Sequence, residues 1–419
     1  MRSFFGVWVV VGSMAVLGCQ SSTSVSEYEA ALRQANTCGE VLEAIQEDEI
    51  AKVDLELKLF VEEEAYYRWG MPVAGEGGAD GDLPGAPTND GAFGEQDAPS
   101  GFSDTNRQVA DVDEADIVKV GDEGRKLYVI RGNRFYEFDS WPAEDTEMAS
   151  DLEIEGSPIE MFVDGDRAVV FSSVYGVEEL DDGDLCQGYG YGPEPGLAEI
   201  DEYYYCGRSY VKISVIDLSA ESHEVVRELY VDGWYTSSRR HDDIVRAIIQ
   251  TNMQRPATIP NFYEVVYDGD YPQSRTEQIA RAQAWADAAK RAILATTLEQ
   301  WLPVWGERID GELEERPFEC ADFYSPAPGL TNYGLSQIVG IDVRDASDTA
   351  MTSILGQATH VYSNADAMIL AQPDWAWHER GTNTDRTALH RFAVSSDGNR
   401  TPYQGSGFVP GVVNDQFSI

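Results

Sequence analysis

The sequence predicts an all-β fold: a β-propeller of four blade-like repeats plus the start of a fifth, forming an incomplete ring, with an N-terminal helical segment and a helical insertion. Four segments of β character resemble one another: residues 126–131, 166–172, 242–249 and 366–371. Each is followed, directly or after an insertion, by a further β segment: 133–140, 210–219, 335–344 and 387–396. Three of these further segments contain an apolar residue followed by Asp, at Asp139, Asp217 and Asp342.

The spacing of the repeats supports a propeller. Residues 105–419, the predicted propeller domain, contain two long insertions, at 174–208 and 251–333. Without them about 200 residues remain, enough for four units of roughly 45 residues and part of another, which is the period of a four-stranded blade. Radial repetition of such sheets limits exposed strand edges. A large β-sandwich with chance similarity between strands is the alternative fold.

The first residues predict export. An apolar run from Phe4 to Leu17 is too short to span a membrane and has the length of a signal-peptide core. It closes with Val16-Leu17-Gly18-Cys19, which resembles the lipobox of bacterial lipoproteins. The resemblance implies a signal peptide at 1–18 and lipidation of Cys19, which anchors the protein to a membrane of the cell envelope. Gln20, where Asp would resemble an inner-membrane retention signal, favours the outer membrane. An ordinary signal peptide is the alternative.

Two further segments precede the propeller. Residues 19–69 are predicted to form a lipid-anchored helical pair, because Ser26-x-x-Glu29 and Thr37-x-x-Glu40 have the form of capping boxes. Residues 70–104 contain nine Gly, seven acidic residues and no Lys or Arg. Such a segment cannot bury enough apolar area to offset its ordering entropy, so we expect an acidic linker.

The first blade is expected to open with a strand at Ala115–Val120. Asp111, Asp113 and Glu114 are then expected in the loop before it, where charge prevents the strand edge from pairing further.

Export changes how the cysteines are interpreted. Besides Cys19, four remain, and an even number in an oxidising compartment suggests two disulfides with three possible pairings. We favour Cys186 with Cys206, because both flank one tyrosine-rich excursion. Cys38 would then pair with Cys320 and tie the N-terminal segment to the main domain.

The larger insertion is predicted to carry a helix from Ser274, as N-cap, to Pro303, which ends it. Ile279, Ala282 and Ala289 are among the apolar residues near helical spacing, so we expect this helix to pack on one face of the propeller.

The charge excludes one class of partner. Asp and Glu number 74 against 30 Lys and Arg, giving a net charge of −44. Phosphate backbones need Lys and Arg, so we expect no nucleic acid partner. The excursion between Cys186 and Cys206 is the candidate recognition loop for an unknown envelope protein or glycan, and a loop packed over the propeller edge is the alternative. Its aromatic residues are Tyr189, Tyr191, Tyr203, Tyr204 and Tyr205.

No catalytic signature is present in the sequence. There is no zinc spacing among the histidines, no GxSxG elbow and no phosphate-binding glycine loop. We expect no cofactor and no metal; the alternative is Ca²⁺ at Asp111, Asp113 and Asp116, although the EF-hand order is absent. Arg239 and Arg240 lie beside two aspartates, Asp242 and Asp243, and are expected to form local charge pairs rather than an anion site.

Residues 105–140, from "TNRQVADVDEADIVKV" to "YEFDS", resemble the first blade of the bacterial and archaeal family of secreted proteins with a C-terminal β-propeller domain, distantly similar to WD-repeat propellers. The resemblance continues at 237–251, 360–372 and 403–419 and so covers essentially residues 105–419. Asp111 stands where the family usually has Gly. The family's propeller normally extends further than this chain, which implies a C-terminal truncation or a ring closed by a partner.

These observations favour a membrane-anchored cell-envelope lipoprotein whose propeller is a non-catalytic binding or scaffolding module. The alternative is a propeller-type hydrolase or lyase acting on an envelope polysaccharide or peptide. A third interpretation is a structural protein that spaces envelope layers.

Overall fold

The computed structural model describes eleven stretches of the chain, and the statements below refer to them: 31–62, 112–180, 208–220, 222–267, 274–309, 311–326, 334–344, 349–373, 386–395, 398–415 and 418–419. Within them, no helix is both long enough and apolar enough to cross a membrane.

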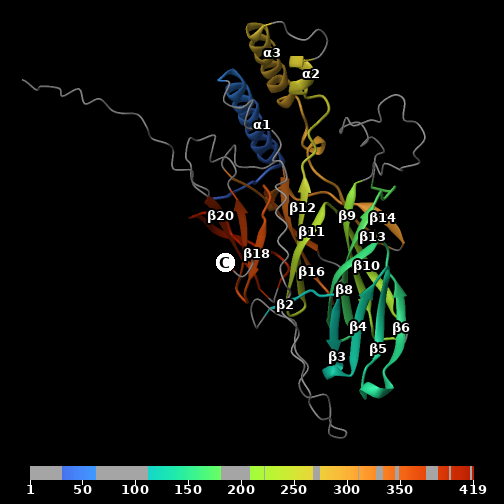
Figure 1. Ribbon diagram of the computed structural model, residues 1–419. Coiled ribbons are helices and arrows are strands. Elements are labelled where there is room, and N and C mark those ends of the chain that lie inside the picture. The colour runs from blue at the N-terminus through green and yellow to red at the C-terminus, as the bar shows by residue number, and fades with distance from the viewer. Residues whose placement is uncertain are drawn as a thin grey trace, which may run out of the picture.

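Four mainly antiparallel sheets follow one another along the chain (Figure 1). The first sheet consists of β3 (Val118–Gly121), β4 (Lys126–Arg131), β5 (Arg134–Asp139) and β6 (Glu147–Glu153). The second is built on β7 (Ser157–Asp164), β8 (Arg167–Tyr175), β9 (Ser209–Asp217) and β10 (Glu224–Asp232). The third is built on β11 (Trp234–His241), β12 (Ile244–Asn252), β16 (Gly334–Asp342) and β17 (Thr349–Leu355). The fourth consists of β18 (His360–Ser363), β19 (Ala367–Pro373), β20 (Arg386–Ala393) and β21 (Tyr403–Pro410).

The strands lie where the sequence repeats predict them. The four similar segments are the second strands of the four sheets, β4, β8, β12 and β19, and the segments after them are the third strands, β5, β9, β16 and β20. The start of a fifth repeat is not seen in the described residues. Residues 403–410 instead form the fourth strand of the fourth sheet, and no strand follows in 411–415 or 418–419.

Short strands from the insertions and the N-terminal region extend two of the sheets. In the second sheet, β10 pairs with β13 (Trp305–Ile309), which pairs with β14 (Glu312–Glu315). In the third sheet, β17 pairs with β15 (Phe323–Ser325), which pairs with β1 (Arg33–Gln34), while β2 (Asp113–Glu114) pairs with β11. The insertion after β12 therefore contributes to two sheets as well as to the helices.

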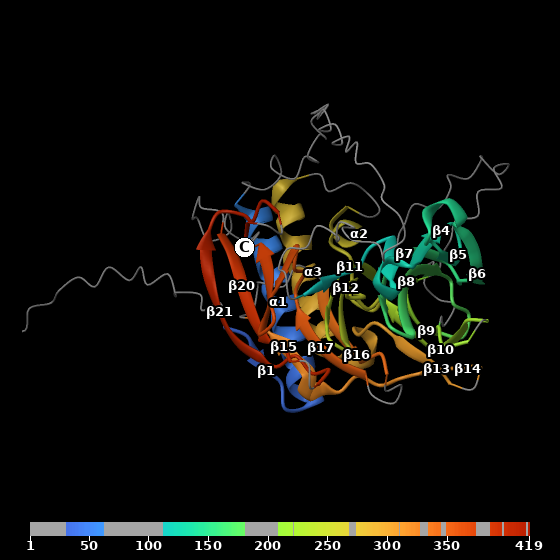
Figure 2. The ribbon, with the colours of Figure 1, turned by 90° about the horizontal axis from the view of Figure 1, so that it is seen from below.

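An apolar cluster fills each junction between neighbouring sheets. The first and second sheets share Tyr128, Phe135 and Val170, among others. The second and third share a cluster that includes Phe171 and Ile249, and a further cluster joins the third to the fourth. Among the described residues, no core cluster joins the first sheet to the fourth. Figure 2 shows these two sheets at opposite ends of the arrangement, with β4, β5 and β6 on one side and β20 and β21 on the other.

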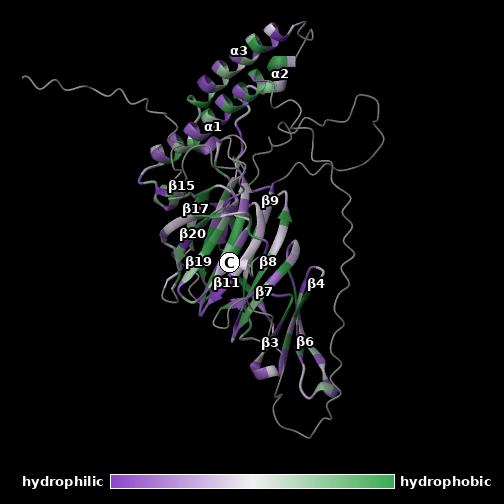
Figure 3. Ribbon diagram, turned by 60° about the vertical axis from the view of Figure 1, so that its left-hand side comes forward, coloured by the Kyte–Doolittle hydropathy of each residue, from purple (hydrophilic) through white to green (hydrophobic). Residues whose placement is uncertain are grey.

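Three helices stand together at one end of the sheets: α1 (Cys38–Val61), α2 (Phe262–Tyr267) and α3 (Arg275–Ile293) (Figure 1). Figure 3 shows hydrophobic and hydrophilic residues alternating along α1 and α3. Their apolar faces meet in one core, which Trp285 fills and which reaches Leu335 and Leu355 of the third sheet. The sequence predicted that α3 packs on a propeller face. It packs mainly on the other two helices instead, because α1 covers its apolar stripe.

The ends of α3 have local causes. Ser274 is the N-cap, as predicted, and its hydroxyl accepts a hydrogen bond from the Glu277 N–H. The helix ends at Ile293, well before the predicted end at Pro303. The Thr296 hydroxyl donates to the Ile293 carbonyl at 2.6 Å, and Thr297 caps a new short helix, η4 (Leu298–Gln300). Side chains that bond to the backbone compete with helix continuation in this way.

One helix, α1, is described where a pair was predicted; Ser26 and Glu29 lie outside the described residues. Thr37 caps α1 by accepting a hydrogen bond from the Glu40 N–H. Glu40 accepts from the backbone N–H of Asn36 at 2.7 Å, one residue earlier than in a standard capping box.

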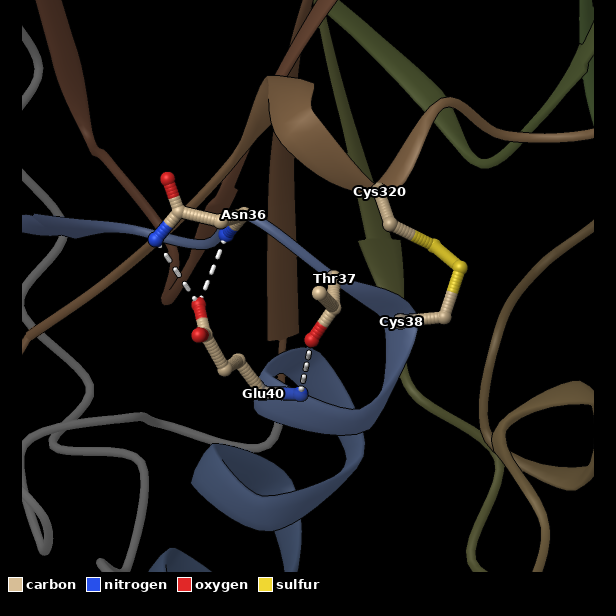
Figure 4. Close-up of a disulfide and its surroundings, with 5 residues drawn as sticks. All are labelled: Asn36, Thr37, Cys38, Glu40 and Cys320. Atoms are coloured by element: carbon tan, nitrogen blue, oxygen red, sulfur yellow. Dashed lines mark hydrogen bonds between the residues drawn. A yellow bond between two sulfur atoms is a disulfide. The ribbon is translucent and has the colours of Figure 1, made fainter.

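A disulfide joins the first residue of α1, Cys38, to Cys320, 282 residues later (Figure 4). It is one of the pairs that the sequence predicts. Cys320 begins a short helix, η5 (Cys320–Asp322), immediately before β15. The bond therefore links the N-terminal helix to the end of the larger insertion.

We predict that Cys38→Ser lowers the free energy of unfolding by about 4 kcal/mol, because the disulfide closes a very long loop and restricts the unfolded chain. Urea unfolding of the oxidised wild type and the variant measures this difference. Cys320→Ser and the double variant serve as controls, since each should lose as much as Cys38→Ser alone. A double variant that loses twice the single effect would contradict the prediction.

Candidate functional site

The candidate site lies where the first strands of three sheets meet. β2 pairs with β11, which places its two acidic residues opposite two arginines, Arg239 and Arg240. Asp116 then forms an isolated β-bridge with Met161 of β7, through backbone hydrogen bonds of 2.9 and 3.1 Å. The chain next enters β3, the first strand of the first sheet. Residues 113–116 thus cross from the third sheet to the second before the first sheet begins.

The polar residues gathered here are termed the first-strand cluster: Asp113, Glu114, Lys119, Glu160, Tyr235, Ser238, Arg239 and Arg240. Asp113 is its ionic centre. Lys119 Nζ lies 2.9 Å from Asp113 Oδ1, and Arg240 Nε lies 3.1 Å from Asp113 Oδ2. Arg240 Nη1 also lies 3.1 Å from Asp164 Oδ2 at the end of β7. One carboxylate therefore links β3 to β11, and Arg240 extends the link to β7.

A carboxyl and a phenol form the second part of the cluster. The Tyr235 hydroxyl of β11 donates to Glu160 Oε2 of β7 at 2.7 Å. The same hydroxyl oxygen lies 2.7 Å from Ser238 Oγ. Since the only phenol proton is used on Glu160, Ser238 is the donor in that second bond. The hydrogen bonds run from Ser238 to Tyr235 to Glu160 and join two sheets.

Burial changes the pKa values of Glu160 and Tyr235. It raises the pKa of Glu160 above its ordinary value, and the nearby carboxylates of Asp116 and Glu114 act in the same direction, while the Tyr235 hydrogen bond and Arg239 oppose them. Burial also raises the pKa of Tyr235 well above its ordinary value, and the Glu160 charge adds to this effect. The phenol therefore stays neutral at all ordinary pH values, and Glu160 holds its proton to higher pH than an exposed glutamate.

Arg239 is the buried cation of the cluster, with a side chain 3% exposed. Its Nη2 lies 3.5 Å from Glu114 Oε1, and its Nη1 donates to Ser237 Oγ at 2.6 Å. Burial lowers the pKa of Arg239, against the opposing charge of Glu114.

This arrangement can do two things chemically. A carboxyl with a raised pKa in contact with a phenol has the properties of a proton donor to a bound substrate. The same groups can also serve as fixed hydrogen-bond partners for a ligand. Ser238 is not an activated nucleophile here, because its hydroxyl bonds to Tyr235 and not to a histidine.

Several site residues predicted from the sequence lie outside the described residues. They are the lipidation residue Cys19, the cysteine pair Cys186 and Cys206, and the recognition-loop tyrosines Tyr189, Tyr191, Tyr203, Tyr204 and Tyr205. Of the disulfide cysteines, Cys38 and Cys320 are bonded to each other.

The alternative calcium site involves residues that have other partners. Asp113 is shared by Lys119 and Arg240, and the Asp116 carboxylate accepts the N–H of Ile117 at 2.7 Å. Asp111 lies outside the described residues. In the described stretches, no three His, Cys, Asp or Glu side chains are grouped so that they could hold a metal ion.

The predicted pairing of Arg239 and Arg240 with the aspartates next to them in the sequence was wrong. The cations of Arg239 and Arg240 pair with Glu114, Asp113 and Asp164 rather than with the adjacent aspartates. Asp242 and Asp243 lie in the turn between β11 and β12. Asp242 adopts a positive φ of 50° there, and Asp243 pairs with Arg344 instead of with Arg239 or Arg240.

The first strand was also placed wrongly. β3 begins at Val118, not at Ala115, and Asp113 and Glu114 form a strand rather than a loop that blocks pairing. The two acidic residues can pair in a sheet because arginines lie opposite them.

Sequence reasoning missed Glu160 and Tyr235. A signal was available for Glu160, which is the one charged residue in the apolar run from Pro158 to Val163. Because buried glutamates are rare without partners, a single glutamate in such a run indicates a polar partner elsewhere in the fold. The identity of that partner could not be found this way, because Tyr235 is 75 residues away and belongs to the next sheet.

A comparison with known protein families matches a region of the chain that contains this site. The family model described as "Beta propeller domain" matches residues 102–419. No curated protein matches the chain.

We predict that Glu160→Gln stabilises the protein relative to wild type increasingly as pH rises. At pH values between the ordinary pKa and the raised pKa of Glu160, the folded state keeps a proton that the unfolded state has lost. The free energy of unfolding of the wild type therefore falls as pH rises through this range. Glutamine does not titrate and can still accept the Tyr235 hydrogen bond. Thermal unfolding at a series of pH values from 4 to 8 measures the difference. Glu144→Gln, at an exposed position, is the control and should show no such trend. A variant advantage that shrinks with rising pH would refute the assignment.

Proposed function

The chain belongs to the β-propeller domain family, and from that premise we propose that it is a lipid-anchored cell-envelope protein whose propeller binds or scaffolds other molecules without catalysing a reaction. Four observations support the proposal: the lipobox-like motif ending at Cys19, the cysteine content of an exported chain, the acidic composition and the organisation of the first-strand cluster.

The first-strand cluster is the main support for a binding or scaffolding role rather than a catalytic one. Its charged groups are committed to one another across three sheets, with Asp113 shared by Lys119 and Arg240 and with Arg239 beside Glu114. Ionic groups arranged in this way position the sheets relative to each other. Such a rigid scaffold is suited to presenting loops for recognition, where binding residues are commonly found.

A catalytic alternative rests on one pair of residues. Glu160 has a raised pKa and contacts Tyr235, which suits a general acid in a hydrolase or lyase acting on an envelope polysaccharide or peptide. The net charge of −44 favours neutral or basic substrates over acidic polymers.

One experiment separates the two functions. The full chain and its Glu160→Gln variant are incubated with purified peptidoglycan and with envelope polysaccharide of the host, and both co-sedimentation and release of soluble fragments are measured. Binding without fragment release, equal in both proteins, supports the proposal. Fragment release that Glu160→Gln abolishes supports the enzyme. If the protein binds neither these polymers nor the host's envelope proteins, and releases no fragments, the result would count against both functions.

We predict that Cys19→Ser moves the protein from the membrane fraction to the soluble fraction and abolishes incorporation of a clickable palmitate analogue, because no thiol remains for lipidation. Fractionation and in-gel fluorescence check this outcome. Cys38→Ser is the matched control and should keep both the label and the membrane association, since its thiol is held in the disulfide. Label retained by Cys19→Ser would disprove lipidation at this residue.

A further inference from the structure

Three buried histidines lie at the junctions between sheets, and their surroundings differ. His223 lies between the first and second sheets, where its ring contacts the carboxylate of Glu137. His241 and His390 lie between the third and fourth sheets. Among the described residues, no carboxylate forms a hydrogen bond with either of these two rings. A proton therefore has a different effect at the two junctions.

His241, the last residue of β11, can form its contacts only as a neutral ring. Its Nε2 lies 3.0 Å from the carbonyl oxygen of Asn364, in the turn between β18 and β19 of the fourth sheet. A carbonyl oxygen can only accept, so Nε2 carries the proton, and Nδ1 accepts a hydrogen bond from Arg246 Nη1 at 3.4 Å. A second ring proton, on Nδ1, would remove that bond and point at a cation.

Arg246 of β12 is a cation fixed at the same junction, and it is 0% exposed. Its Nη2 donates to the carbonyl oxygens of Ser395 and Gly398, and its Nε donates to the Thr401 hydroxyl at 3.3 Å. These three partners lie between β20 and β21 in the chain, so Arg246 fastens the fourth sheet to the third. In the described part of the chain no carboxylate pairs with it. A protonated His241 would add a second buried cation beside the first, which is costly.

His390 of β20 lies on the same face of the fourth sheet as Phe392, the face that packs on the third sheet. Its Nε2 lies 3.2 Å from Gln372 Oε1, and its Nδ1 lies 2.6 Å from Ser406 Oγ. The Tyr403 hydroxyl contacts the same Ser406 oxygen at 2.7 Å. All these groups are neutral, and burial lowers the pKa of His390 from 6.5 to about 4.

The pKa of His241 is lowered as well. Burial is the main cause, and the charges of Arg246 and Arg239 act in the same direction, while the Asn364 hydrogen bond and the Asp242 charge oppose it. A histidine whose pKa is depressed in the closed junction binds a proton more readily once the junction opens. The closed state therefore loses stability as pH falls from about 6.5 toward the lowered pKa.

The other two junctions respond to acid differently. At the first, a proton on His223 faces Glu137. Burial raises the pKa of Glu137, but Lys126 and His223 more than offset this, so the carboxylate keeps its charge in mild acid. At the second, burial raises the pKa of Glu160, which bonds to Tyr235 across the sheets. The closed state there holds a proton more tightly than the open state, so that junction gains stability as pH falls.

We propose that the junction between the third and fourth sheets is a pH-sensitive joint, which opens in mildly acidic surroundings while the other two junctions stay closed. Opening exposes the apolar cluster that joins these sheets, including Ile338, Leu370 and Phe392.

The size of the effect follows from the histidines. With a pKa of about 4 when closed and about 6.5 when open, His390 alone shifts the balance toward the open form by about 30-fold between pH 7.5 and pH 5. His241 adds to this shift in the same direction.

Hydrogen exchange of the full chain at pH 7.5 and pH 5, followed by mass spectrometry and corrected for the intrinsic effect of pH on exchange, tests the proposal. Peptides from β19 and β20 should lose about 30-fold or more in protection at pH 5, because the freed sheet has no core on its inner face and exchange tracks the opening equilibrium. Peptides from β4 and β8 should keep their protection.

A variant carrying both His241→Gln and His390→Gln removes the two titrating groups. Glutamine is neutral and can both donate and accept hydrogen bonds, so the fold should survive, which circular dichroism at pH 7.5 verifies. Protection of β19 and β20 in this variant should be the same at both pH values. His360→Gln is the matched control, because His360 lies in β18 of the same sheet and its ring contacts the neighbouring Thr359 hydroxyl. It should keep the wild-type response.

The proposal is overturned if the wild type is equally protected at both pH values, if all four sheets lose protection together, or if the double variant responds to pH as the wild type does. If the double variant does not fold, two measurements decide. One is the comparison of fourth-sheet with first-sheet peptides in the wild type. The other is His390→Gln alone, which should reduce the response by about 30-fold.

Discussion

The packing of one apolar sheet face against the next is the interaction on which the rest of the structure depends. Each fully buried Val, Leu, Ile or Phe contributes about 1.5–3 kcal/mol, and each of the three junctions contains several of them. The solvent-exposed ion pairs between the sheets are weaker. Arg344 reaches Asp164, Asp166 and Asp243 across the second and third sheets, but its side chain is 43% exposed. Exposed pairs contribute only about 0–1 kcal/mol each. The apolar clusters therefore hold the sheets together, and the ion pairs set how their ends are aligned.

This division of roles explains why large insertions are tolerated. Residues 174–208 and 251–333 leave the second and third strands of their sheets in register, as β8 with β9 and β12 with β16 show. Loop-closure entropy grows slowly with length, so an insertion costs little if it forms its own core. The larger one does so around Trp285, with α1 supplying the other half. The disulfide between Cys38 and Cys320 then joins two parts of that core that are far apart in sequence.

Features that depend on residues close together in the sequence could be predicted, whereas features that depend on contacts between distant residues could not. Strand alternation and turn residues are local signals, so the second and third strands were placed well, and so was the N-cap at Ser274. The end of α3 was missed because the Thr296 hydroxyl competes for the backbone, a contact that apolar periodicity does not reveal. The first-strand cluster was missed for a different reason. Glu160 and Tyr235 meet only after two sheets have packed, and no local pattern encodes that meeting.

The acidic tract before β3 shows how a chain of net charge −44 can bring carboxylates into its interior. Asp113 and Glu114 enter the third sheet as a strand, which requires cations opposite and beside them, and Arg239, Arg240 and Lys119 supply these. Since acidic residues outnumber basic ones by more than two to one, most carboxylates must remain in solvent, where repulsion between them is screened. The basic residues at the meeting of three sheets are largely buried, so their attraction to the nearby carboxylates is screened less by solvent than it would be on the surface. The apolar clusters assemble the sheets, and the placement of these few cations is what allows the acidic tract to enter the third sheet.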